Sequence, residues 1–221
     1  MAPQSAGYAY CSIFTMINST DPRLVAAVVY DDCVSIDLLL AAFAAELATA
    51  GTKIAGVIQL TEERGCGPGA PMRLMDVATG EILPICRTLG AQSCRVDGER
   101  FTGAAARIRA ACDGEAELVF VSRFGAVEAH GYGFRGEMEL VIRRERPLLT
   151  AVRRGFVHNW FELTGGVGTL LDARLWVLRN WWSELPSRKT TALARATDIA
   201  DVAPWAGRVL RLVEPPKVER P

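Results

Sequence analysis

The chain has 221 residues, half of them hydrophobic, which is enough to bury one sizeable core in a single domain. Its 25 basic and 25 acidic residues balance, so the composition does not indicate a nucleic-acid partner. The six cysteines lack CxxC spacing, which favours reduced thiols over a disulfide framework. Residues 1–22 lack a basic stretch followed by an apolar one, so we expect no secretory signal. We expect this segment to be a disordered arm, or an over-long reading with Met16 as the true start, of a cytoplasmic protein.

The first strand and the turn after it carry the most information. Leu24–Tyr30 is a nearly continuous apolar run, typical of a strand that is buried on both faces of a parallel sheet. The turn that follows, Asp31-Asp32-Cys33-Val34-Ser35, contains no glycine and leads into an apolar helix over roughly Ser35 to Ala50. Glycines at such a turn let backbone N–H groups approach a phosphate. The two carboxylates here would repel a phosphate and compete with it for the positive helix end.

Strands and helices then alternate. Lys53–Leu60 reads as a second strand, and Met72–Val77 and Glu81–Cys86 flank the turn at 78–80 as a β-hairpin. The later elements are expected as a helix at Phe101–Cys112, a strand at Glu117–Ser122, a loop at Arg123–Phe134, a helix at Gly136–Arg144 and a strand at Pro147–Val152. This alternation predicts a three-layer α/β/α sandwich with a mostly parallel sheet.

The C-terminal part is expected to extend this domain. Val167–Leu185 reads as a helix rich in tryptophan, and its charged residues make it unsuited to span a bilayer. Its leucines and Trp182 share one face, which favours packing against the domain or against a partner chain. Residues 186–221 read as a tail with a short docked element possible within 202–212. The expected organisation is therefore an arm over 1–22, an α/β domain over 23–166, and a helix with a tail over 167–221.

Four motifs in order carry a resemblance to a known family. They are Tyr30-Asp31-Asp32, Asp76-Val77-Ala78-Thr79-Gly80, Cys94-Arg95-Val96-Asp97, and Ser122-Arg123-Phe124-Gly125-Ala126-Val127-Glu128. Residues 23–166 resemble the thermophile-type nucleoside-triphosphatases. They more closely resemble a related, uncharacterised bacterial family that is often encoded near molybdenum-transport or nitrogen-fixation genes. The resemblance implies a P-loop-NTPase-like fold with an inserted β-hairpin, here followed by a C-terminal helical extension.

The chain departs from the triphosphatase pattern at both key positions. That family implies a glycine-rich turn with Lys and Ser/Thr, which hold the phosphates and Mg²⁺. It also implies an acidic pair at the end of the later strand, where this chain has Ser122-Arg123. The charges are therefore exchanged: acidic where phosphate would be held, and basic where metal would be held. The residues that ordinary Mg²⁺-dependent hydrolysis would use are therefore missing from both positions.

The candidate ligand-binding residues lie at the carboxyl edge of the predicted sheet. Asp31 and Asp32 are candidates for a cation or a sugar hydroxyl, or simply for a helix cap, to which Ser35 also contributes. Arg123, next to Ser122, is expected to bind an anion or to pair with Asp31, Asp32 or Glu128. Glu128 is expected to orient Arg123 or to act as a base.

Arginines on the loops around the hairpin are the remaining candidates. Arg64, Arg73 and Arg95 would form an anion-binding lid if those loops fold over the same crevice, because guanidinium groups bind oxyanions bidentately. The alternative is that they are ordinary solvated arginines. No cysteine or histidine spacing indicates a metal site.

Three functions remain open from the sequence. The leading hypothesis is a degenerate P-loop-NTPase-like protein that binds a small ligand, either a nucleotide or an oxyanion, as an accessory in molybdenum-linked metabolism. The second is a nucleoside triphosphate phosphohydrolase with a rearranged site, in which Asp31 and Asp32 would hold Mg²⁺; Mg²⁺ is implied only in that case. The third is an interaction module that meets a partner or a second copy through residues 167–185. The prediction leans toward a protein without enzymatic activity, with no nucleic-acid or membrane partner.

Overall fold

The computed structural model describes residues 21–31, 34–60, 72–88, 94–185 and 205. Most of them build a seven-stranded sheet of order β4-β3-β2-β7-β8-β1-β9. Its strands are β1 (Val25–Tyr30), β2 (Ile54–Leu60), β3 (Arg73–Asp76), β4 (Ile82–Pro84), β7 (Leu118–Val121), β8 (Leu148–Arg153) and β9 (Thr169–Asp172). The pairs within β2, β7, β8, β1 and β9 are parallel, while β3 and β4 are antiparallel. The predicted α/β class with a mostly parallel sheet is confirmed.

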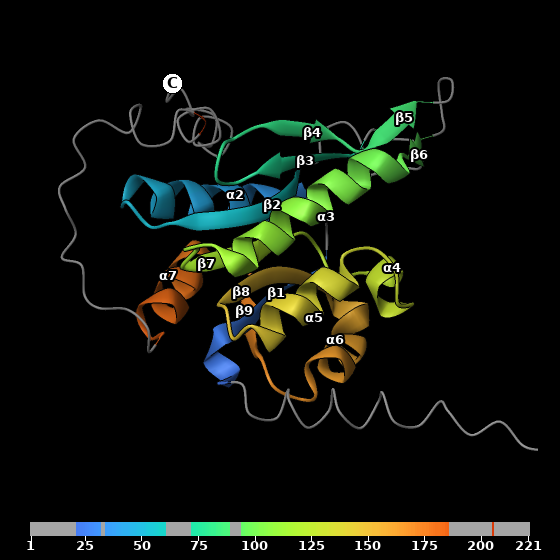
Figure 1. Ribbon diagram of the computed structural model, residues 1–221. Coiled ribbons are helices and arrows are strands. Elements are labelled where there is room, and N and C mark those ends of the chain that lie inside the picture. The colour runs from blue at the N-terminus through green and yellow to red at the C-terminus, as the bar shows by residue number, and fades with distance from the viewer. Residues whose placement is uncertain (1–20, 32–33, 61–71, 89–93, 186–204, 206–221) are drawn as a thin grey trace, which may run out of the picture.

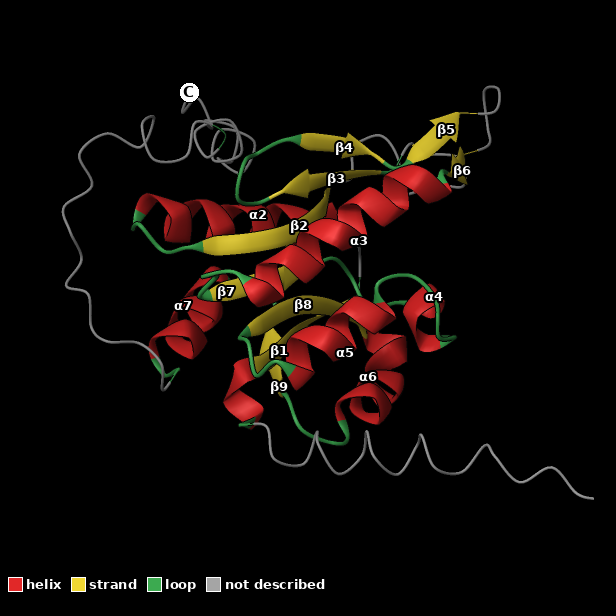
Figure 2. Cartoon of the chain, viewed as in Figure 1, coloured by secondary structure: helices red, strands yellow, loops and turns green. Residues whose placement is uncertain are grey.

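Helices cover both faces of the sheet, which gives the expected three layers (Figures 1 and 2). On one face lie α2 (Val34–Thr49) and α7 (Leu175–Ser183), whose buried residues share one core cluster. On the other face lie α3 (Gly98–Asp113), α5 (Arg135–Arg143) and α6 (Val157–Thr164), which share the second cluster. The short helix α4 (Ala126–Ala129) lies in the segment expected as a loop, and α3 begins three residues before the predicted start.

The hydrophobic pattern explains the order of the strands. β1, β7 and β8 are almost wholly buried, and such continuous apolar runs belong in the centre of a parallel sheet. β4 forms one edge, is largely exposed and contains Pro84, which cannot donate to a sheet ladder. β3 and β4 flank the predicted turn, where Gly80 has a φ of 72°. A short two-stranded ribbon of β5 (Cys86–Thr88) and β6 (Cys94–Val96) follows and was not predicted.

The segment 167–185 is not the single helix that we expected. It contains β9, which pairs in parallel with β1 at the edge of the sheet, and only then the helix α7. Because Leu170 and Leu171 alternate between the two sides of the strand, an apolar run that looked helical fits a strand as well. The division of the chain at residue 166 stays a proposal, although β9 places part of the second segment in the sheet.

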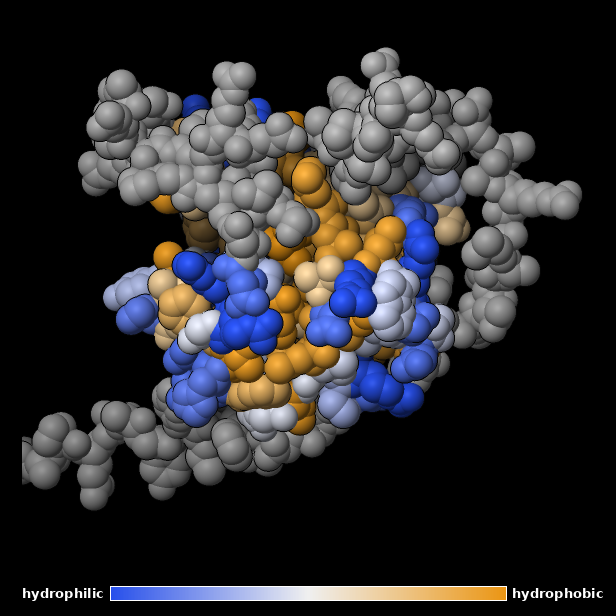
Figure 3. Space-filling view, turned by 180° about the vertical axis from the view of Figure 1, so that it is seen from behind, coloured by the Kyte–Doolittle hydropathy of each residue, from blue (hydrophilic) through white to orange (hydrophobic). Residues whose placement is uncertain are grey.

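Helix α7 packs against the domain by the face that carries its large residues. Leu178, Trp181 and Trp182 are buried, and the Trp181 indole nitrogen donates to the Arg23 carbonyl at 2.9 Å. Trp176 points away from this contact and is 56% exposed. Figure 3 looks onto the face of α2 and α7, where hydrophobic residues gather in the middle of the surface.

A tryptophan of the C-terminal stretch and two cysteines add to the description of the fold. Trp205, the described residue of the last stretch, is buried in the same core cluster as α2. It packs so closely on Gly80 that a Cβ atom there would lie 2.3 Å from the indole ring. Cys86 is disulfide-bonded, so the expectation of reduced thiols is wrong at this residue; Cys112 is free and buried.

Candidate functional site

The strand order indicates where a ligand crevice is expected, at the carboxyl ends of β1 and β8. The chain leaves β1 for α2 on one face, whereas it leaves the neighbouring strand β8 for α6 on the other face. Adjacent strands whose connections diverge in this way form a topological switch point, where open α/β sheets bind their ligands. The turn after β1 and the segments after β7 and β8 therefore border this crevice.

An exposed ion pair lies at the switch point itself. Asp31 follows β1, and Arg154 follows β8 on the adjacent strand. Nε and Nη2 of Arg154 donate to the two carboxylate oxygens of Asp31 at 2.7 and 3.0 Å. The hydrogen bonds from Arg154 lower the pKa of Asp31 below its usual value. Asp31 is thus engaged by an arginine that the sequence analysis did not single out.

Arg123 makes a second, more buried ion pair with a residue of α2. It follows β7, and its Nη2 donates to Oδ2 of Asp37 at 2.8 Å. The Asp37 side chain is 2% exposed and the Arg123 side chain is 13% exposed. The guanidinium also lies over the ring of Tyr30, 5.9 Å from its centroid. We expected Asp31, Asp32 or Glu128 as partners of Arg123; within the described residues it pairs with Asp37. Asp32 lies outside the described residues, so its pairing with Arg123 stays a prediction.

The position of Asp37 has an electrostatic reason. It lies in the first turn of α2, where the positive end of the helix dipole stabilises a carboxylate. This is the helix whose first turn would face a phosphate in a nucleotide-binding fold. The structure therefore places a protein carboxylate, paired with Arg123, in the helix turn where a nucleotide-binding fold would hold a phosphate. One signal was present in the sequence: Asp37 is the lone charged residue within Val34–Ala45.

Glu128 holds the loop after β7 rather than orienting Arg123. One carboxylate oxygen accepts a hydrogen bond from the Gly125 N–H at 3.1 Å and the other from the Phe134 N–H at 3.3 Å. Gly133 is required beside it, because a Cβ there would lie 2.1 Å from Oε1 of Glu128. Burial raises the pKa of Glu128 above its usual value, and the backbone hydrogen bonds oppose this rise. Its geometry is that of a loop-stabilising residue.

A cavity of about 240 Å³, which we name the carboxyl-edge cavity, opens beside these residues. Its aromatic lining comprises Tyr30, Phe101 and Phe134, the last two stacked with ring centroids 4.5 Å apart. Its polar lining comprises Gln59, Ser122, Arg123 and Glu128, and the rest is apolar or glycine. Val96 and Val127, which also line it, are each at least half exposed. The cavity is thus mostly apolar with a few polar groups, as small-molecule sites are.

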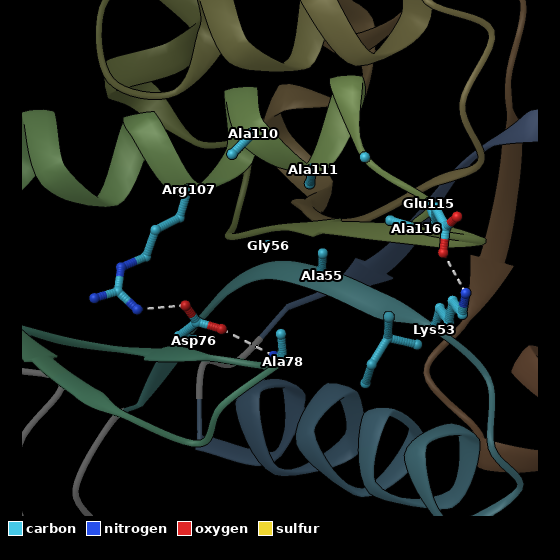
Figure 4. A pocket seen from close by; sticks show the side chains of 12 residues that line it. Lys53, Ala55, Gly56, Asp76, Ala78, Arg107, Ala110, Ala111, Glu115 and Ala116 are labelled. Carbon is cyan, nitrogen blue, oxygen red and sulfur yellow. Dashed lines mark hydrogen bonds and ion pairs between the residues drawn. The ribbon is translucent and has the colours of Figure 1, made fainter.

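A second cavity, of about 390 Å³, lies at the opposite end of β2; we name it the amino-edge cavity (Figure 4). Its floor is formed by small residues of β2 and α3, among them Ala55, Gly56, Ala110 and Ala111. Its charged residues are paired at the rim: Lys53 with Glu115, and Arg107 with Asp76. Arg107 also donates to Glu81 at 2.7 Å. This cavity offers paired charges around a floor without polar side chains.

Of the remaining candidate residues, only some of those that the structure describes line the carboxyl-edge cavity. Ser122 lines it, and its carbonyl accepts a hydrogen bond from the Thr150 hydroxyl at 2.9 Å. Arg73 lies on β3 between two lining residues, Met72 and Leu74, but does not itself line the cavity. Asp32 and Arg64, as well as the side chains of Ser35 and Arg95, lie outside what the structure describes. The proposed arginine lid therefore stays a prediction.

Within the described ranges, no group of three or more histidine, cysteine, aspartate or glutamate residues has the geometry to hold a metal ion. Within the same ranges, no helix combines the length and the apolar character needed to cross a membrane.

The chain was then compared with known proteins. The molybdenum import ATP-binding protein ModC 2 of Bradyrhizobium diazoefficiens is 32% identical to it over 199 residues. The match covers 86% of this chain but only 22% of that relative. No solved structure matches the chain. A family model described as "Protein of unknown function (DUF2478)" matches residues 25–181, from the first strand of the sheet into α7. The chain therefore belongs to this family.

Proposed function

We propose that this protein binds a small ligand with an anionic group, a nucleotide or an inorganic oxyanion, in the carboxyl-edge cavity and acts without hydrolysing it. The observation that carries the proposal is the placement of Arg123. Among the described residues that line the cavity, Arg123 is the one with a positive charge, and its guanidinium is held on the wall by Asp37. A guanidinium fixed at the carboxyl edge of a parallel sheet is well suited to bind an anion.

The walls of the cavity favour a ligand that also contains a planar ring. Tyr30, Phe101 and Phe134 offer aromatic surface on which a nucleobase would pack, and Gln59 and Ser122 offer hydrogen bonds. A bare tetrahedral oxyanion would be satisfied by a polar cradle, which the described lining residues do not form. The volume of about 240 Å³ is below the usual range of ligand pockets, so it suits a base or a small head group rather than a whole triphosphate.

The turn between β1 and α2 supports ligand binding without ordinary Mg²⁺-dependent hydrolysis. The turn after β1 contains carboxylates instead of a glycine-rich loop with lysine. Asp37, in the first turn of α2, adds a buried carboxylate. Arg123 stands where the triphosphatase family has its metal-binding acidic pair. Together with the carboxylates after β1, it supports the proposal that a P-loop-like fold has here a site for a different ligand chemistry. We infer a degenerate site and an accessory role.

The relative that carries molybdenum in its name supports a metabolic setting. Because the chain spans only 22% of that protein, its printed activity is a proposal here. We propose that the ligand belongs to molybdenum-linked metabolism, so ATP and molybdate are tested beside AMP, whose base and single phosphate fit the described walls better.

The experiment is a thermal-shift panel on the full chain. It uses AMP, ATP, molybdate, tungstate, sulfate and phosphate, each with and without Mg²⁺. We expect a rise in Tm with at least one of these anions that is lost in Arg123→Met, weakened in Arg123→Lys and retained in Arg107→Met. Arg107 is the matched control because it is also ion-paired but lies at the amino-edge cavity.

Two results would contradict the proposal. A Tm shift that survives in Arg123→Met places the ligand elsewhere. Mg²⁺-dependent release of phosphate from ATP, abolished by Asp32→Ala, identifies a phosphohydrolase instead.

A further inference from the structure

We propose that Asp37 is the positioning residue of the ligand site: it fixes the Arg123 guanidinium on the wall of the carboxyl-edge cavity and limits the charge of the ligand that the cavity accepts. The inference deepens the proposed function and rests on it insofar as Arg123 contacts the ligand. It differs from a merely structural role because it assigns Asp37 an effect on ligand selectivity.

The geometry separates the two members of the pair. Arg123 lines the cavity, whereas Asp37 lies behind it on α2 and does not line the cavity. Asp37 accepts a hydrogen bond from Nη2 of Arg123 at 2.8 Å, so the carboxylate meets one end of the guanidinium. Tyr30 packs against the same guanidinium from β1. Held from two elements, the guanidinium has a fixed place when a ligand arrives, which lowers the entropy lost on binding.

The charges near the cavity define which ligands fit. Among the described residues, Asp37 pairs with Arg123 from behind the wall, and another carboxylate, Glu128, lies on the wall and accepts two backbone hydrogen bonds. A ligand with more negative charge is attracted more strongly by Arg123 and repelled more strongly by the carboxylates, because both Coulomb energies are proportional to the ligand charge. The repulsion that Asp37 contributes therefore costs a dianion about twice what it costs a monoanion. Asp37 thereby acts against polyphosphates.

The test uses two probes of nearly the same shape that differ in charge. Benzenesulfonate and phenylphosphonate both present an aromatic ring and a tetrahedral head. The sulfonate has one negative charge, and the phosphonate has two above its second pKa. Their dissociation constants are measured calorimetrically at such a pH on wild type, Asp37→Asn, Asp37→Glu and the double variant Asp37→Asn/Arg123→Met. Circular dichroism establishes that each variant is folded.

We expect the Asp37 charge to weaken the binding of phenylphosphonate more than that of benzenesulfonate. Loss of the Asp37 charge should tighten phenylphosphonate by roughly tenfold or more, and benzenesulfonate by about the square root of that factor. Asp37→Glu keeps the charge and should keep the wild-type preference. The double variant should lose the gain, because it also lacks the attraction of the ligand to the Arg123 guanidinium.

Several outcomes overturn the inference. It fails if Asp37→Glu, which keeps the charge, changes the ratio of the two affinities as much as Asp37→Asn does. It also fails if folded Asp37→Asn leaves the ratio of the two affinities unchanged, or if the double variant keeps the gain. If wild type binds neither probe nor any anion of the panel, but Asp37→Asn binds phenylphosphonate through Arg123, the proposed function fails and the role of Asp37 stands. If wild type binds benzenesulfonate through Arg123 and Asp37→Asn has the same charge preference, the function stands and the role of Asp37 fails.

Discussion

The two ends of strand β2 use similar charged residues to opposite effect. At the amino-edge cavity, Lys53 and Glu115 pair on the surface, with both side chains more than half exposed. At the carboxyl-edge cavity, Arg123 and Asp37 pair almost out of contact with water. An exposed pair contributes little to stability, and a ligand that displaces it costs little. A buried pair has a fixed geometry and is costly to break. Burial, more than the kinds of residue, therefore distinguishes a rim from a candidate binding wall.

The largest effect is expected at the floor of the amino-edge cavity. Gly56 has a φ of 104°, and a Cβ there would lie 1.9 Å from the Phe120 carbonyl oxygen of the neighbouring strand. Gly56→Ala should lower the free energy of unfolding by roughly 3 kcal/mol or more, because strain and overlap add. Urea denaturation measures the loss. The control is Gly103→Ala, an exposed α3 position with open space, which should stabilise by about 0.5–1 kcal/mol. Equal behaviour of the two variants would show that this floor is not rigid.

The buried pair at the carboxyl edge should give the next largest loss. Arg123→Met leaves the Asp37 carboxylate buried without its guanidinium, which should cost about 3–5 kcal/mol in urea denaturation. The double change Arg123→Met/Asp37→Leu removes both charges and should recover most of that loss. A single variant as stable as wild type would mean that the pair is solvated in solution.

The matching change at the amino edge should cost much less. Arg107→Met removes the pairs with Asp76 and Glu81, but the Arg107 side chain is already one-third exposed. Asp76 keeps two hydrogen bonds, from the N–H groups of Ala78 and Thr79. We expect a loss of about 1 kcal/mol by the same measurement. A loss as large as that of Arg123→Met would remove the difference between the two ends.

Glu128 gives the carboxyl edge a pH dependence. Burial raises its pKa in the folded state, so the folded protein binds this proton more tightly than the unfolded chain does. The associated stability is complete below the unfolded pKa and is lost as the pH rises through the folded pKa. Free energies of unfolding measured across this window should fall less steeply in Glu128→Gln than in wild type. The exposed control Glu99→Gln should keep the wild-type slope; an unchanged slope in Glu128→Gln would contradict the assignment.

The smallest effect is expected at Asp31. Its hydrogen bonds with Arg154 are well formed, but both side chains are about two-thirds exposed, so solvent and salt screen them. Asp31→Asn should therefore leave the urea midpoint unchanged within error. A clear loss of stability, removed by high salt, would show that the crevice at the switch point is more enclosed than the structure indicates.

The buried part of the fold was predictable because hydrophobic pattern and element type are local properties of the chain. The apolar runs around β1, β7 and β8 identified the central strands, and the turn at Ala78-Thr79-Gly80 identified the antiparallel pair. The prediction of one helix over 167–185 was wrong for the first half of that segment, because a short apolar strand and a helix can share the same composition. The ribbon of β5 and β6 was missed because strands of three residues have no measurable period.

By itself, the sequence determined the class of the fold and placed the charged residues of Asp31-Asp32 and Ser122-Arg123 directly after two predicted strands. The binding of a ligand at the carboxyl ends of those strands stays a proposal. Only the tertiary structure decided which charges meet. Arg123 lies 86 residues from Asp37, and Arg154 lies 123 residues from Asp31. An ion pair over such a separation depends on strand order and helix placement, which the chain fixes through packing of its whole core. The partner of a charged residue is thus a property of the fold, while the residue itself is a property of the sequence.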